Sequence, residues 1–168
     1  RTRPVVIAAA HSAWIATMAL AEEAATLASG LILVDPPASH APGSLRAAAD
    51  HMSAALGQGL NRADYDNAIF AAFDTQGVDE ALCEAASHVG LPSLVIRGAL
   101  GQVDPDGAQP TFVESLLNVE AIDVDGGGLL IMAERAEAFN GLLIDFLERK
   151  QPRFIPEYRS GSDARTLR

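Results

Sequence analysis

Apolar and polar residues alternate along the chain in blocks, and these blocks predict strands and helices. Three short apolar runs, residues 4–9, 31–34 and 93–97, have the length and composition of strands buried on both faces, and residues 120–124 follow in the same rhythm. Residues 13–29 contain no Gly or Pro and are rich in Ala, Leu and Met, which predicts one helix. This helix is apolar on nearly all sides and is therefore expected to be largely buried, with Gly30 as its C-terminal cap.

A strand, a helix and a strand at this spacing form a βαβ unit, which implies a parallel sheet. Residues 38–90 show helical stretches without a strand pattern and are interpreted as an inserted helical layer or a cap over one end of the sheet. Helices are also predicted near residues 109–117 and over 133–149. The expected architecture is one α/β domain over residues 1–150, with at least four parallel strands, helices on both faces and a helical cap within 38–90. Residues 151–168 are expected to form a linker or tail.

Composition and charge narrow the classes of partner. The first 148 residues carry 20 acidic and 6 basic side chains, so the body of the protein should repel phosphate backbones and bind no nucleic acid. No apolar run approaches the roughly 20 residues of a membrane span and no signal peptide is evident, so we expect a cytoplasmic protein without membrane contact. The single cysteine, Cys83, is interpreted as a buried structural thiol.

No cofactor or metal ion is expected from the sequence. Gly126, Gly127 and Gly128 lack the Lys-Ser/Thr pair of a phosphate loop and the spacing of a dinucleotide fingerprint. Asp123 and Asp125 flank a strand end, but they complete no set of cation ligands.

The strand exits carry the candidate chemistry. Ser12 lies between the first strand and the first helix, where a serine can cap the helix. Asp35 ends the second strand at the edge where ligands bind in open α/β sheets, although an Asp before two prolines also fits a plain turn. Asp104 is a second candidate acid, in a stretch that reads equally as a turn.

The segment PVVIAAAHSAWIATMALAEEAATLASGLILVDPP resembles the strand, nucleophile elbow, helix and strand of α/β-hydrolases. The resemblance places Ser12 at the nucleophile position and makes His11 and Trp14 candidate substrate contacts. Trp14 is larger than the small residue that the pattern has two positions after the nucleophile. Either the elbow holds this side chain, or two small residues are absent and Trp14 begins the helix.

Two further segments extend the resemblance over about residues 4–150. LPSLVIRGALGQVDP is similar to the strand and loop that bear the catalytic acid in this family, and the position of the acid is Gly101. DVDGGGLLIMAERAEAFNGLLIDFL is similar to the histidine-bearing loop and last helix, and the position of the histidine is Leu129, a candidate substrate contact. The tail SGSDARTLR weakly resembles the start of flavin-reductase-like, FMN-binding domains.

The resemblance implies an α/β-hydrolase-like sheet whose N-terminal strands are missing and whose catalytic triad is degenerate. Its open sheet edge is expected to be covered by an oligomer contact or a covalent fusion. One interpretation is a hydrolase-family protein, impaired or rewired, that acts on a small ester-, thioester- or amide-like organic substrate, with Ser12, Asp35 and Asp104 as candidate catalytic residues. The other is a non-catalytic hydrolase-like domain that binds a ligand or partner and is fused to a flavin reductase.

Overall fold

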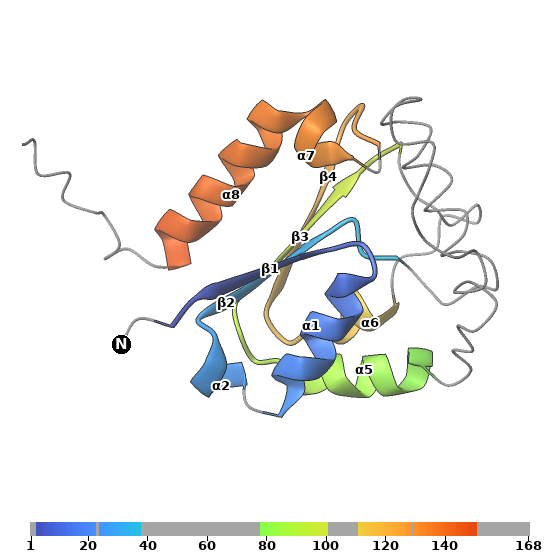
Figure 1. Ribbon diagram of the computed structural model, residues 1–168, viewed down its shortest axis with the longest axis vertical. Coiled ribbons are helices and arrows are strands. Elements are labelled where there is room, and N and C mark those ends of the chain that lie inside the picture. Colours follow the sequence, from blue (N-terminus) through green and yellow to red (C-terminus); the bar gives the residue numbers. More distant parts are fainter. Residues whose placement is uncertain (1–2, 23, 38–77, 101–110, 129, 151–168) are drawn as a thin grey trace, which may run out of the picture.

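The computed structural model describes residues 3–22, 24–37, 78–100, 111–128 and 130–150. Its strands are β1 (Val5–Ala9), β2 (Gly30–Val34), β3 (Ser93–Gly98) and β4 (Val119–Val124). Its helices are α1 (Ser12–Ala21), α2 (Ala24–Leu27), α5 (Val78–His88), α6 (Thr111–Ser115), α7 (Ile131–Glu134) and α8 (Ala136–Lys150). Figure 1 shows helices on both sides of one sheet.

The four strands form one parallel sheet in the order β1-β2-β3-β4, the same as their order in the chain. The predicted α/β class and parallel sheet of at least four strands are therefore confirmed. All five residues of β2 and all six of β3 are buried, which explains why these strands read as continuous apolar runs. Because all strands run in the same direction, their carboxyl ends meet at one edge of the sheet.

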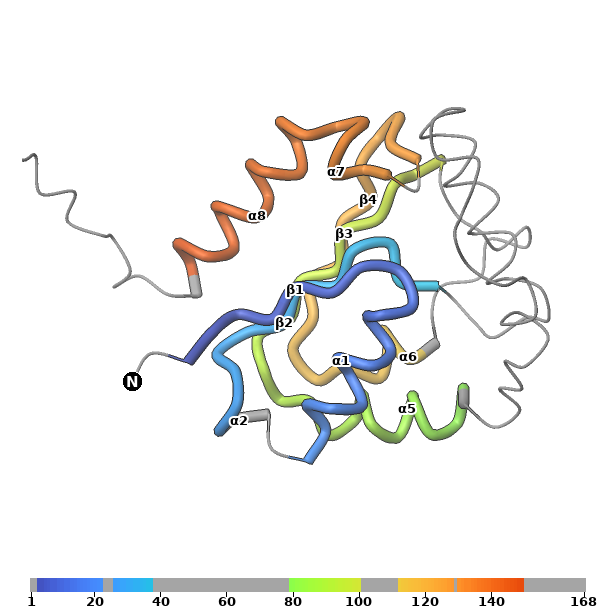
Figure 2. Tube along the Cα trace, in the orientation of Figure 1, coloured from blue at the N-terminus to red at the C-terminus, as the bar shows by residue number. Residues whose placement is uncertain are grey.

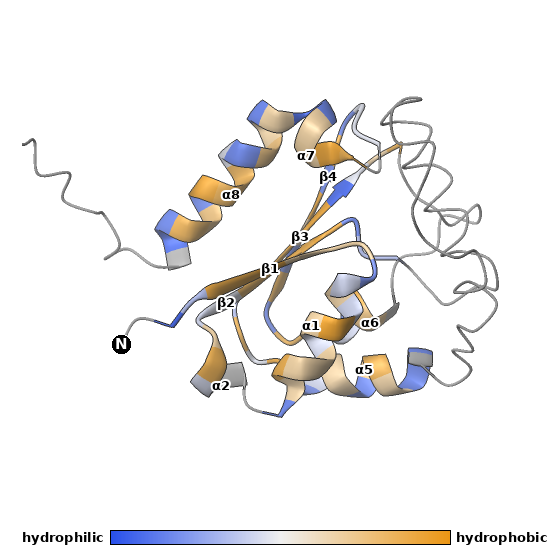
Figure 3. Cartoon of the chain, in the orientation of Figure 1, coloured by the Kyte–Doolittle hydropathy of each residue, from blue (hydrophilic) through white to orange (hydrophobic). Residues whose placement is uncertain are grey.

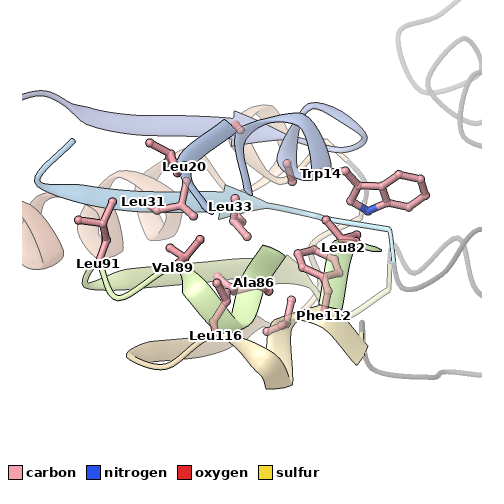
Figure 4. Packing of buried hydrophobic residues seen from close by; sticks show 14 of the residues in the cluster. Trp14, Leu20, Leu31, Leu33, Leu82, Ala86, Val89, Leu91, Phe112 and Leu116 are labelled. Carbon is pink, nitrogen blue, oxygen red and sulfur yellow. The ribbon is translucent and has the colours of Figure 1, made fainter. Parts of the chain in front are cut away.

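The larger hydrophobic core lies between the sheet and the helices α1, α5 and α6, as Figure 4 shows from close by. Leu31, Leu33 and Val95 point to this face from the two central strands, and α5 contributes Leu82 and Ala86. A smaller core lies on the opposite face, which α8 covers (Figure 2). Neighbouring residues of each strand thus serve opposite cores, as the alternation of side chains along a strand requires.

The helix predicted over residues 13–29 is two helices in the structure, since α1 ends at Ala21 and α2 spans Ala24–Leu27. A straight helix of 17 residues would be about 25 Å long, whereas the five residues of β1 span only about 17 Å. The chain must return to the start of β1, where the Ser29 amide donates a hydrogen bond to Pro4 O at 2.9 Å. The break between α1 and α2 therefore shortens the helical connection so that it matches the length of β1.

Gly30 is not a helix cap, so that prediction is wrong. It is the first residue of β2, pairs with Val5 and has no positive φ. A Cβ at this position would lie 3.4 Å from Pro92 O and 3.5 Å from Phe146 Cε1. These are ordinary van der Waals distances, so neither a left-handed turn nor a steric clash explains the glycine at this position.

The prediction that the first helix is largely buried is also wrong. Only Ala13, Trp14, Thr17 and Leu20 are buried in α1, whereas the side chains of Ile15 and Met18 are 70% and 47% exposed. Ile7 in the neighbouring edge strand β1 is 50% exposed, and Figure 3 shows the apolar character of both elements. Exposed apolar side chains are therefore present both on α1 and on the edge strand β1 in the part of the chain that the structure describes.

Residues 38–90 divide into two parts. Residues 78–88 form α5, which packs against α1 and α6 in the layer on one face of the sheet. Residues 38–77 lie outside the described residues, so the cap stays a prediction, as does the linker over 151–168. None of the described helices combines the length and hydropathy needed to cross a membrane.

Candidate ligand site at the carboxyl edge of the sheet

The residues that follow the four strands share one edge of the sheet, the place where open α/β sheets bind ligands. Two non-glycine residues at this edge have left-handed backbone conformations, Ala10 after β1 with φ 48° and Asp35 after β2 with φ 44°. No other described non-glycine residue has a positive φ. Such conformations cost of order 1–3 kcal/mol each and cluster at functional sites.

The turn from β1 into α1 is centred on Ala10. Its amide donates a hydrogen bond to Val34 O at 2.8 Å, which extends the β1–β2 pairing, and its carbonyl accepts one from the Ala13 amide at 3.0 Å, which begins the helix. Ala8, two residues before, and Ser12, two residues after, are both small. This is the spacing of small residues around the strained residue of a nucleophile elbow.

The Ser12 hydroxyl is turned back onto the end of β1. It donates a hydrogen bond to Ala9 O at 2.5 Å and accepts one from the Ala9 amide at 3.0 Å. Because the amide of Ala10 points to β2, the peptide groups of Ala9 point to the unpaired side of β1. Ser12 therefore satisfies the last free peptide groups of the edge strand.

His11 and Trp14 lie together beside this turn. Their rings meet edge to face, with centroids 5.0 Å apart and planes inclined by 66°. The indole N–H of Trp14 donates a hydrogen bond to Pro37 O at 3.3 Å, and the side chain is buried. Trp14 is the third residue of α1, and its side chain ties the turn after β1 to the segment after β2.

Asp35 is held by the neighbouring strand. Its Oδ1 accepts a hydrogen bond of 2.7 Å from the amide of Gly98, the last residue of β3. Its Oδ2 is buried and has no hydrogen-bond partner among the described residues.

The environment of Asp35 raises the pKa of its carboxyl group from 3.8 to about 6. Burial is the largest cause, and the negative charge of Glu134 adds to it. The hydrogen bond from Gly98 and the positive charge of Arg97 act in the opposite direction. A carboxyl group poised near neutral pH at a sheet edge is a candidate functional group.

The loop after β4 packs onto the end of β3. The Leu100 amide donates to Gly127 O at 2.8 Å, and a Cβ at Gly98 would collide with the carbonyl oxygens of Gly127 and Gly128. Glu134 fixes the loop by accepting a hydrogen bond of 2.6 Å from the Gly128 amide.

Arg135 holds the same loop from its other side. Its Nε donates a hydrogen bond of 3.2 Å to Gly126 O. Glu134 and Arg135 lie in the segment that resembles the histidine-bearing loop and last helix of the family, but the resemblance assigned them no role. The signals that could have indicated this role are the carboxylate of Glu134, six residues after the three-glycine loop, and the adjacent guanidinium of Arg135.

The remaining predicted site residues are not placed. Asp104, Gly101 and Leu129 lie outside the described residues, so their roles stay predictions. Asp123 forms a two-pronged ion pair with Arg97, with N···O distances of 2.7 and 3.1 Å, and this pair joins β3 to β4. Within the described ranges, no group of three His, Cys, Asp or Glu side chains is arranged to hold a metal ion.

No family model matches the sequence, and no curated protein is similar to it in sequence. Solved structures, however, show the same fold. The chain superposes on MGS-M2, an α/β-hydrolase enzyme from a Medee basin deep-sea metagenome library, with a TM-score of 0.60 and 16% identity. The match covers 87% of this chain and 65% of that one.

Two other structures have similar values. A mutant of the meta-cleavage product hydrolase CumD from Pseudomonas fluorescens IP01 has a TM-score of 0.61 and 11% identity, with 88% of this chain and 65% of that chain covered. The proline iminopeptidase of Mycobacterium smegmatis has a TM-score of 0.56 and 18% identity, with 88% and 66% covered. At these identities the likeness shows the fold, an α/β-hydrolase-like parallel sheet, and the chain spans about two thirds of the length of these proteins.

Proposed function

We propose that this chain is a hydrolase-like protein that binds a small ester-, thioester- or amide-like organic compound at the carboxyl edge of its sheet. In this proposal its serine-hydrolase chemistry is impaired or rewired. The likeness of fold supports the hydrolase-like part of the proposal. The proposed ligand class rests on the resemblance of the sequence segments.

One observation carries the impairment: the strained residue between β1 and α1 is Ala10, which has no nucleophilic atom. The nearby Ser12 hydroxyl donates a hydrogen bond to the Ala9 carbonyl oxygen. A peptide carbonyl cannot act as a general base for an attacking serine. Leu129 and Gly101 at the positions of the histidine and the acid in the resemblance point the same way.

The test combines covalent labelling with a binding measurement. A fluorophosphonate probe should fail to label the chain rapidly and stoichiometrically, and hydrolysis of methyl butyrate, S-methyl thiobutyrate and butyramide should stay far below the ordinary range of about 1–10³ s⁻¹. At least one of the three compounds should nevertheless bind saturably in ligand-detected NMR. Fast labelling that Ser12→Ala abolishes, or no binding of any compound, would overturn the proposal.

A matched pair of variants locates the missing nucleophile. In a background of Leu129→His and Gly101→Asp, which restores the two triad positions of the resemblance, Ala10→Ser should increase fluorophosphonate labelling. Ser12→Ala in the same background should leave labelling unchanged. If labelling instead depends on Ser12 and not on residue 10, the nucleophile position is Ser12 after all.

A further inference from the structure

The carboxyl group of Asp35 is fixed in direction by three features of the described structure. Its backbone is held in a left-handed conformation, its amide donates a hydrogen bond to Ile96 O at 2.8 Å, and its Oδ1 accepts the Gly98 amide at 2.7 Å. Gly98 in turn is held against the loop of residues 126–128. The backbone of Asp35 and its Oδ1 are both held by hydrogen bonds. The position of the other carboxyl oxygen, Oδ2, is therefore fixed as well.

Oδ2 of Asp35 is an unsatisfied carboxyl oxygen at this site. It is buried without a hydrogen-bond partner among the described residues, and leaving a buried polar atom unpaired costs on the order of 1–3 kcal/mol. The residue that carries it also bears backbone strain that asparagine and aspartate tolerate but do not prefer. Two costs at one residue, at the edge where the fold binds ligands, indicate a binding group.

The charges around Asp35 decide what it can bind. Glu134 adds a second negative charge, while Arg97 has its guanidinium group bound to the carboxylate of Asp123 through both Nε and Nη2. Asp35 and Glu134 thus place two carboxylates beside one guanidinium, and the carboxylate of Asp123 already pairs with that guanidinium. An anion would be repelled here, whereas a cation with an N–H donor would satisfy both the charge and the free oxygen.

We propose that Asp35 is the anchor of the ligand site and that its Oδ2 accepts a hydrogen bond from a protonated amine of the bound compound. The inference rests on the proposed function in one respect, since it places the amine on the same organic compound that the sheet edge binds. It narrows the ligand class to compounds that combine an acyl group with an ammonium group.

The test uses the full chain and three probes of one shape: benzylammonium, benzyl alcohol and benzoate. Dissociation constants are measured by NMR titration, together with the carboxyl carbon resonance of Asp35. We expect benzylammonium to bind most tightly, to shift the Asp35 resonance and to lower the pKa of this carboxyl group. The proposal is overturned if benzoate binds as tightly as benzylammonium, or if the Asp35 resonance does not respond to benzylammonium. Neither outcome depends on a variant of the protein.

Asp35→Asn is the matching variant, because asparagine accepts a left-handed φ and can keep the hydrogen bond from Gly98 while it replaces Oδ2 by a donor. It should weaken benzylammonium binding by about tenfold or more. Asp125→Asn, at an exposed carboxylate just after β4, is the control and should leave binding unchanged. If both variants weaken binding equally, general surface charge explains the effect and the anchor is wrong.

The result is separable from that of the proposed function. Rapid hydrolysis through Ser12 would end the claim of impaired chemistry, yet binding of benzylammonium that depends on Asp35 would stand. Binding of butyramide without any response to benzylammonium would leave the proposed function in place and remove the anchor.

Discussion

Ala10 and Ser12 are two residues apart in the turn after β1, and the structure gives them different roles. Ala10 has the left-handed backbone that turns the strand into the helix, whereas the Ser12 side chain closes the free peptide groups of Ala9. A hydroxyl group engaged in this way stabilises the end of an edge strand. Loss of the Ser12 hydroxyl should therefore lower the stability of the folded protein and leave its rate of ester hydrolysis unchanged.

Ser12→Ala should lower the free energy of unfolding by about 1 kcal/mol, the usual net contribution of such hydrogen bonds. Hydrolysis of activated esters should be unchanged. Ser87→Ala is the control, because the Ser87 hydroxyl also donates to a carbonyl three residues before it, that of Glu84, but within a helix where alanine is favoured. Urea denaturation of both variants checks this, and a loss of stability in Ser87→Ala alone would contradict it.

The raised pKa of Asp35 predicts a dependence of stability on pH. The folded state binds the proton more tightly than the unfolded state does, so the contribution of this group to stability increases as the pH falls through about 6 toward 3.8. At about 1.4 kcal/mol per pKa unit, the change has an upper limit of about 3 kcal/mol.

Asp35→Asn isolates this effect from other carboxyl groups. It should be more stable than the wild-type protein at about pH 7.5, and this advantage should shrink toward about pH 5. Thermal denaturation at several pH values measures the difference. An advantage of Asp35→Asn that is constant over this range would show that the carboxyl group does not titrate there.

At the scale of elements, contacts between neighbouring segments determine where α1 ends and where the loop after β4 lies. α1 stops at Ala21 because the connection must return to the start of β1, and the loop of residues 126–128 can approach β3 only because residue 98 has no side chain. Both constraints join segments far apart in the sequence. The contact between Gly98 and the loop should therefore tolerate no added methyl group.

Gly98→Ala should destabilise the protein by about 1–3 kcal/mol or displace the loop after β4, as overpacking does in a filled site. Gly90→Ala is the matched control, since a Cβ at Gly90 meets no atom within 4 Å and Gly90 has no positive φ. It should be neutral or stabilising by up to about 1 kcal/mol. Denaturation curves of the two variants that coincide would refute this account of Gly98.

At the scale of the whole molecule, the sheet was predictable because β2 and β3 are buried on both faces and leave continuous apolar runs in the sequence. The break after Ala21 and the strand position of Gly30 were not, because each depends on contacts with distant segments. Asp35 could be placed at a strand exit from the sequence. Its hydrogen bond to Gly98 joins residues 63 positions apart, and no local pattern reports it. The sequence did not indicate Ala10 as the strained residue, because the resemblance centred the turn on Ser12 and the small residues were counted from there.

The exposed apolar side chains beside β1 predict that the isolated chain associates through this edge. Ile7→Lys should reduce association in sedimentation velocity experiments over a range of concentrations. Ile144→Lys replaces a side chain of nearly equal exposure on α8, 54% against 50%, and should have no effect. A wild-type chain that stays monomeric at about 100 µM would contradict the prediction, since hydrophobic edges pair at such concentrations.

The order of the strands also bears on how the chain folds. Because β1-β2-β3-β4 is both the spatial and the chain order, β2, β3 and β4 each pair with the described strand that precedes them, and none of these four is inserted between two earlier ones. During synthesis from the amino terminus, every new strand therefore finds its neighbour already made. The long connection from Val34 to Ser93 makes the pairing of β3 with β2 the step with the largest loop-closure cost among the described strands. Growth of the sheet can follow translation one βα unit at a time.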